Sequence, residues 1–84
     1  MDIKSWKIML AVDDYGSFTR VGAELGYTQS GITQMMKNLE KKVGFPLYIK
    51  DHHGITLTNE AKSLIPAIRT LLNADEVIHQ EIAA

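Results

Sequence analysis

The sequence contains no cysteine and no long apolar run, and these two absences restrict its function before any motif is considered. Without cysteine, the 84 residues can form no disulfide, no cysteine-based zinc finger and no thiol-dependent active site. No run approaches the roughly 20 apolar residues of a membrane-spanning helix, and the segment MDIKSWKIML lacks the basic end of a signal peptide. We therefore expect one small soluble cytoplasmic domain that is stabilised by apolar packing alone.

A strongly basic composition, the usual mark of a nucleic-acid-binding domain, is also missing, because the net charge is −1. The charge is unevenly distributed along the chain, however. Residues 1–16 carry −1, residues 17–58 carry +2 and residues 59–84 carry −2. An anionic partner is therefore expected to contact the middle of the chain.

Apolar residues at helical spacing predict two short helices in the first 26 residues. The first ends at Gly16, and the second is capped by Ser17 and ends at Gly26. The residues expected on their inner faces are Ile3, Trp6, Met9 and Leu10, followed by Phe18, Val21, Gly22 and Leu25.

A third helix is predicted to begin after Thr28 or Gln29 and to end at Gly44. Its expected buried stripe is Ile32, Met35, Met36, Leu39 and Val43. At about 100° per residue, the opposite face carries Ser30, Thr33, Gln34, Lys37 and Lys41. This face has hydroxyl, amide and ammonium groups and no acid at its centre, so it suits DNA bases and phosphates.

The stretch VGAELGYTQSGITQMMKNLEK joins the second and third helices through a short turn that contains glycine. Small and apolar residues stand where the two helices must cross, which predicts a helix-turn-helix with its recognition helix at about residues 29–42. Thr28, Gln29 and Ser30 lie at the predicted N-terminus of that helix, where free N–H groups favour a phosphate. The alternative is an ordinary solvated face on a three-helix core.

A hairpin and a long helix are predicted for the second half of the chain. Residues 47–49 and 55–57 form short β-type runs on either side of the polar tip Lys50–Gly54. Thr58 or Asn59 then caps a helix that runs to the C-terminus with one broad apolar face, and Pro66 is expected to bend it.

The segments GSFTRVGAELGYTQSGITQMMKNLEKKVG and PLYIKDHHGITLTNEA, in this order, resemble the N-terminal DNA-binding domain of LysR-type transcriptional regulators. The resemblance implies a mainly α fold, a winged helix-turn-helix with a three-helix core and a two-stranded wing, plus a long C-terminal linker helix. We accordingly assign residues 1–58 to the DNA-binding domain and residues 59–84 to the linker and dimerisation helix.

The resemblance also implies the function and the contacting residues. The chain would bind double-stranded operator or promoter DNA as a homodimer at the bacterial nucleoid, with the recognition helix in the major groove and wing 47–57 on the adjacent minor groove or backbone. The groove-facing residues would be Thr28, Gln29, Ser30, Thr33, Gln34 and Lys37. Phosphate contacts would come from Ser17, Thr19 and Arg20, and wing contacts from Lys50, His52 and His53. Dimer contacts would come from Leu64, Ile68, Leu71, Leu72, Ile78 and Ile82 on the fourth helix.

The chain departs from the family pattern at three places. The family commonly has two small residues, usually alanines, where Val21 and Gly22 stand, and arginines at the wing positions of Lys50, His52 and His53. Pro66 is also less expected. Full-length members continue into an effector-binding domain and form higher oligomers, so we expect this chain to be part of a longer protein.

Several alternatives remain open from the sequence. The adjacent histidines with Asp51 suggest a metal site or a general base, but neighbours at a hairpin tip diverge and no tetrahedral ligand set is available, so we expect no metal, no cofactor and no enzyme activity. The histidines either contact DNA or form a solvated turn. The fourth helix either pairs with a copy or packs only on its own domain, and the whole module is either a DNA-binding domain or a winged-helix protein-contact domain.

Overall fold

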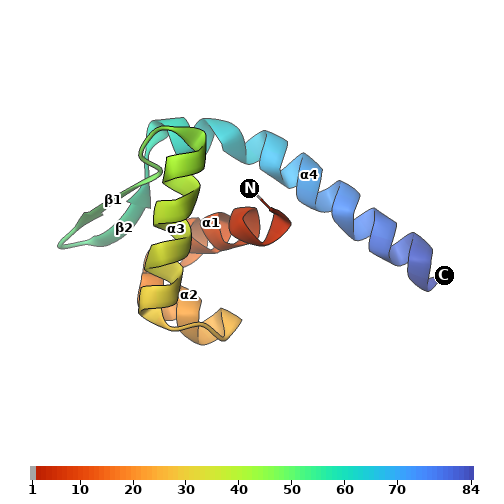
Figure 1. The fold of residues 1–84 in the computed structure, drawn as a ribbon, viewed down its shortest axis with the longest axis horizontal. Helices are drawn as coiled ribbons and strands as arrows, with labels where there is room; N and C mark the ends of the chain where they lie inside the picture. The colour runs from red at the N-terminus through yellow and green to blue at the C-terminus, as the bar shows by residue number, and fades with distance from the viewer. Residues whose placement is uncertain (1) are drawn as a thin grey trace.

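A computed structural model describes residues 2–84 and contains the predicted elements in the predicted order. These are α1 (Ile3–Tyr15), α2 (Phe18–Leu25), α3 (Gln29–Val43), β1 (Tyr48–Asp51), β2 (Gly54–Leu57) and α4 (Asn59–Ala83). Figure 1 shows α1, α2 and α3 grouped together, with the hairpin projecting to one side and α4 extending away on the other. The elements thus divide into a three-helix body and two projections.

Side-chain caps and glycines set the ends of the helices. Ser17, Thr28 and Thr58 cap α2, α3 and α4, and each side chain accepts a backbone N–H from the first turn of its helix. Ser17 was the predicted cap of α2, and Thr58 is one of the two residues, Thr58 or Asn59, that were predicted to cap α4. Asp2 caps α1 in the same way. The first three helices end at glycines with left-handed backbone conformation, as the sequence predicted.

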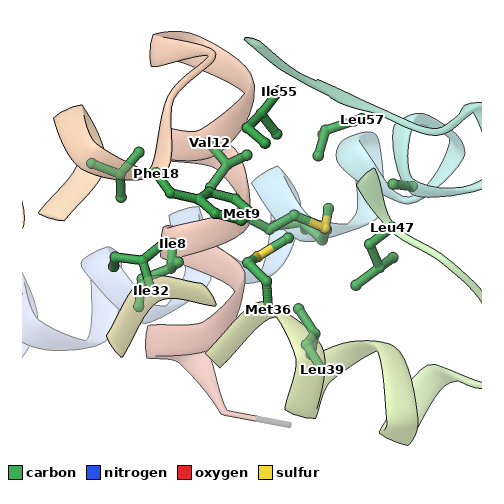
Figure 2. Close-up of a cluster of buried hydrophobic side chains, with 13 residues drawn as sticks. Ile8, Met9, Val12, Phe18, Ile32, Met36, Leu39, Leu47, Ile55 and Leu57 are labelled. Carbon is green, nitrogen blue, oxygen red and sulfur yellow. The ribbon is translucent and has the colours of Figure 1, made fainter. Parts of the chain in front are cut away.

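The core lies where α1 crosses α3 and the base of the hairpin (Figure 2). The largest fully buried side chains are Ile8, Met9, Ile32, Met36, Leu39, Leu47, Leu57, Val12 and Val21. The predicted inner face of α1 was partly wrong. Trp6 and Leu10 are only half-buried, whereas Ile8 and Val12 are buried. Leu25, predicted on the inner face of α2, is 44% exposed because it is the last residue of that helix, where the chain turns away towards α3.

The hairpin pairs Tyr48 with Leu57 and Asp51 with Gly54, so only two residues form its tip. Lys50 and Asp51, expected in the tip, therefore belong to β1. The N–H of Ile55 donates to the carbonyl oxygen of Gly16 at 2.9 Å. This bond attaches β2 to the corner between α1 and α2, which fixes the hairpin relative to the helices.

Helix α4 packs on the body through its first half only. Ala61 and Ile68 are buried, and Leu64 and Leu72 are half-buried against the core. Pro66 lies inside the helix without interrupting it. The second half carries Ile78 and Ile82 with exposed fractions of 58% and 76%, and it extends beyond the body in Figure 1.

Candidate nucleic-acid interface

The crossing of α2 and α3 depends on Gly22. Its carbonyl oxygen accepts the N–H groups of Gly26 at 2.9 Å and Tyr27 at 2.8 Å, which closes the turn between the helices. A Cβ atom at Gly22 would lie only 2.5 Å from the carbonyl oxygen of Tyr27. The position that the family pattern fills with a small residue therefore has room only for glycine here.

The N-terminus of α3 is built by Thr28. Its hydroxyl accepts the N–H of Gly31 at 3.0 Å and lies 3.3 Å from the hydroxyl of Ser30. Gln29 and Ser30 are exposed beside it. Thr28 is thus occupied with capping, and Gln29 and Ser30 are the residues whose side chains are presented to a ligand at this helix end.

The exposed face of α3 is partly organised by its own hydrogen bonds. The hydroxyl of Thr33 donates to the carbonyl oxygen of Gln29 at 3.1 Å, and the amide Nε2 of Gln34 donates to Oδ1 of Asn38 at 2.9 Å. Asn38 was not among the predicted contact residues, although it lies one turn beyond Gln34. The pair leaves the Oε1 acceptor of Gln34 and the amide donors of Asn38 for a partner.

Lys37 is turned towards the base of the hairpin. Its Nζ lies 5.1 Å from the centre of the Tyr48 ring and 3.8 Å from Oε1 of Glu40. The hydroxyl of Tyr48, and then the charge of Glu40, raise the pKa of Lys37 above its ordinary value. The ammonium group therefore stays charged at neutral pH, at the junction of α3 and β1.

Glu40 and Thr58 hold the base of the hairpin. Oε2 of Glu40 accepts the N–H of Leu47 at 2.8 Å, which ties α3 to the start of the hairpin. The hydroxyl of Thr58 donates to the carbonyl oxygen of Pro46 at 2.9 Å and accepts the N–H of Ala61 at 3.1 Å. The sequence predicted a cap at Thr58 or Asn59 but no role for Glu40, because the presence of a glutamate does not reveal which backbone group its side chain binds.

A small notch brings together residues that the sequence predicted separately. It has a volume of about 130 Å³ and is lined by Gly16, Ser17, Phe18, Thr19, Gln29, Lys50, Gly54 and Ile55. Lys50 from β1, Gln29 from α3 and the first residues of α2 thus face one space. The N-terminus of α2 has its positive dipole end here, so the notch suits an anion. Arg20 lies outside it, with its guanidinium 5.2 Å from the centre of the Tyr15 ring.

The two histidines form the exposed tip of the hairpin. Their ring centres are 3.9 Å apart with a tilt of 44°, and Oδ1 of Asp51 accepts the N–H of His53 at 2.8 Å. Within residues 2–84, no three His, Cys, Asp or Glu side chains gather closely enough to hold a metal ion. Nor does any helix in that range have the length and apolar character to cross a membrane.

A family model described as bacterial regulatory helix-turn-helix protein, lysR family, matches residues 3–62. The chain belongs to the LysR family. The HTH-type transcriptional regulator CzcR of Bacillus cereus is 32% identical to this LysR-family chain over 78 residues, which is 92% of the chain and 27% of CzcR. The LysR-family chain thus spans about a quarter of the length of the curated relatives it matches.

Solved structures of LysR-family regulators share the fold. The CbnR_DBD–DNA complex matches with a TM-score of 0.89 at 25% identity, covering 99% of this LysR-family chain and 95% of that one. Full-length CbnR complexed with its target DNA matches with a TM-score of 0.86 at 28% identity, covering 100% of this chain and 30% of that one. The predicted winged helix-turn-helix with a long C-terminal helix is confirmed.

Proposed function

We propose that this domain binds double-stranded DNA sequence-specifically, as a dimer, in bacterial transcription regulation. Helix α3 would enter the major groove, and the hairpin, acting as the wing, would lie on the adjacent minor groove or backbone. The observation that carries the proposal is the notch, where the start of α2, the start of α3 and Lys50 of the wing converge on one anion-sized space. The two DNA complexes among the structural matches support it.

The arrangement separates positioning from sequence reading. The notch would hold a backbone phosphate through Lys50 and the first N–H groups of α2, which fixes the domain on the duplex without reading sequence. The exposed face of α3, with Ser30, Gln34 and Asn38, would then meet base edges. Arg20, exposed on α2, would contact a second phosphate.

Salt-dependent binding tests this function. Random and promoter-derived duplexes should be titrated at several salt concentrations, and the logarithm of affinity should fall linearly with the logarithm of salt. Alanine at Lys50 or Arg20 should weaken all sequences alike and reduce the salt slope by about one. A module that contacts only proteins would show no salt-dependent DNA binding, and that result would reject the proposal.

The hydrogen bond between Gln34 and Asn38 predicts a paired effect on base preference. Gln34→Ala should change the preference at one base pair by about 1–3 kcal/mol, because a direct contact is lost. Asn38→Ala should alter preference at the same position, because it releases the amide that Asn38 now orients. A panel of operators with single base-pair changes measures both. Effects at unrelated positions, or uniform weakening by both variants, would show that this face does not read sequence.

The wing-tip histidines predict a pH dependence of DNA affinity. Imidazole changes charge between about pH 5 and 8, and a nearby phosphate favours the protonated form, so affinity should fall as pH rises from about 6 to 8. Replacing both His52 and His53 with glutamine should remove most of the slope, which we expect to be several-fold in dissociation constant.

His79→Gln is the matched control for this experiment. His79 lies on α4, 3.5 Å from Asp75 and far along the chain from the wing, so its loss should leave the pH slope intact. Equal slopes for the parent and the wing double variant would exclude the histidines from DNA contact.

A further inference from the structure

Glu40 holds the segment that follows α3 at two points. Its carbonyl oxygen accepts the N–H of Gly44 at 2.8 Å, which ends the helix. Oε2 of its carboxylate accepts the N–H of Leu47 at 2.8 Å, and Leu47 directly precedes β1. One residue of α3 therefore determines both where that helix stops and where the hairpin starts.

The Leu47 end of this link is held on both sides. Leu47 is fully buried, and its carbonyl oxygen accepts the N–H of Thr58 at 3.0 Å. The side chain of Glu40 is only 18% exposed, and a hydrogen bond to a charged acceptor is stronger where water is largely excluded. The bond between Glu40 and Leu47 is therefore a defined joint between α3 and the hairpin.

Lys37 and Tyr48 complete the joint. Nζ of Lys37 lies 3.8 Å from Oε1 of Glu40 and 5.1 Å from the centre of the Tyr48 ring. The ammonium group thus offsets the charge of the carboxylate, and it contacts the first residue of β1 from the side of α3. Both carboxylate oxygens of Glu40 are engaged within the domain.

The joint is connected to the notch through one face of β1. Because side chains alternate along a strand, Tyr48 and Lys50 lie on the same face of β1. The Tyr48 ring packs edge-to-face on the Phe18 ring, with their centres 4.9 Å apart, and Phe18 and Lys50 both line the notch. A rotation of β1 about Leu47 would therefore move Lys50 relative to the notch.

We propose that Glu40 is a positioning residue for DNA binding. Through Leu47 it fixes the orientation of the wing, so that Lys50 holds its phosphate while α3 lies in the major groove. This inference rests on the DNA-binding function proposed above and specifies how its two contacting elements are coupled. Glu40 touches no DNA in this arrangement, and what matters is the reach of its side chain to Leu47.

The alternative is that Glu40 acts only through its charge. A carboxylate beside a DNA-binding face repels phosphates, so any neutral replacement would strengthen binding and a replacement that keeps the charge would leave binding unchanged. The positioning role predicts a different pattern, because a neutral side chain of the same length keeps the joint and a shorter charged side chain breaks it.

Two substitutions at Glu40 separate reach from charge. Glu40→Gln keeps the length of the side chain and a carbonyl oxygen that accepts the Leu47 N–H, but it loses the charge. Glu40→Asp keeps the charge, but it is one methylene group shorter and should not reach Leu47. Amide hydrogen exchange at Leu47, followed by NMR, should stay slow in Glu40→Gln and become at least tenfold faster in Glu40→Asp.

The salt dependence of binding to a random-sequence duplex reports the effect at the wing. In the parent and in Glu40→Gln, Lys50→Ala should lower the salt slope by about one. In Glu40→Asp the slope should already be lower by about one, and Lys50→Ala should change it no further. From about 50 to 200 mM salt, the affinity of Glu40→Asp should therefore fall about 3.5-fold less than that of the parent.

Glu24→Gln is the matched control for the loss of an acid. Glu24 is exposed on α2, so replacing it removes one negative charge without touching the joint. Its salt slope and its response to Lys50→Ala should equal those of the parent. Circular dichroism at the titration temperature should show that each variant is folded, because a folded domain of lower stability still contacts the same number of phosphates.

The outcomes distinguish this inference from the DNA-binding function. If Lys50→Ala changes the slope equally in the parent and in Glu40→Asp, the positioning role is wrong and DNA binding stands. If Glu40→Gln loses the slope contribution of Lys50, reach is not sufficient, and the positioning role is again wrong. That result also decides the question if Glu40→Asp does not fold. If the parent shows no salt-dependent binding, the DNA-binding function fails and this inference fails with it.

Discussion

Replacing Gly54 with alanine should cost about 2–5 kcal/mol of folding free energy and weaken DNA binding by more than tenfold. Two costs add at this position. Gly54 has φ of 116°, which an L side chain adopts only with about 1–2 kcal/mol of strain. Its new Cβ would also lie 2.7 Å from the carbonyl oxygen of Gly16, which is backbone and cannot move alone, and such overpacking costs about 1–3 kcal/mol.

The DNA-binding effect follows from what that carbonyl group holds. The Gly16 oxygen accepts the N–H of Ile55, so pushing β2 away breaks the bond between the wing and the corner of α1 and α2. The notch that Lys50 shares with the start of α2 would open as well. Urea unfolding and a duplex titration measure the two effects.

Gly44→Ala is the matched control for Gly54→Ala. Gly44 also has a positive φ of 87°, but no neighbouring atom lies within 4 Å of the added Cβ. Gly44→Ala should therefore lower the free energy of unfolding only by the cost of the strained backbone, about 1–2 kcal/mol. If the two variants are equally destabilised, the contact between the wing and the helical corner contributes nothing to stability.

Replacing Gly22 with alanine should destabilise the domain by about 1–3 kcal/mol, even though alanine is the better helix former by up to about 1 kcal/mol. The added Cβ would meet the Tyr27 carbonyl oxygen at 2.5 Å, so α2 and α3 must separate. Because α3 would shift relative to the notch, DNA affinity should fall together with stability. Thermal or urea unfolding shows whether the Gly22→Ala variant is less or more stable than the parent domain.

Gly31→Ala provides the comparison for Gly22→Ala. Gly31 is also helical, but its added Cβ meets only the Thr28 hydroxyl at 3.1 Å, which is the end of a side chain. The free energy of unfolding of the Gly31→Ala variant should stay unchanged or rise by up to about 1 kcal/mol. A stabilised Gly22→Ala variant would mean that α2 and α3 can separate at no cost in free energy.

The sequence predicted the features that depend on local chemistry. Glycine stops, side-chain caps and the apolar stripe of α3 determine where helices begin and end, and each was placed correctly to within about a residue. The buried side of α1 was not placed correctly. Apolar residues lie on two adjacent sides of this helix, and only the packing of α3 and β2 against it determines that Ile8 and Val12 are buried. The candidate DNA contacts likewise include features that local chemistry determines and features that depend on packing between elements.

Sequence patterning identified which faces are polar but not how their groups are already bonded. Thr28, Thr33 and Gln34 all make hydrogen bonds within α3, and Lys37 turns towards Tyr48. Of the residues predicted for the dimer, Ile68 is buried in its own domain. Such distinctions depend on rotamers and on contacts between distant segments, which periodicity does not encode.

The double role of Thr58 affects how the proposed dimer would fit on DNA. One hydroxyl caps α4 and also holds Pro46 at the base of the wing, so the start of the long helix is bonded directly to the hairpin. The burial of Ala61 and Ile68 stiffens the same connection. In the proposed dimer, the position at which the two α4 helices pair therefore sets the distance between the two recognition helices. Sliding the pair by one residue changes the separation of the two recognition helices by about 1.5 Å, and so selects the distance between operator half-sites.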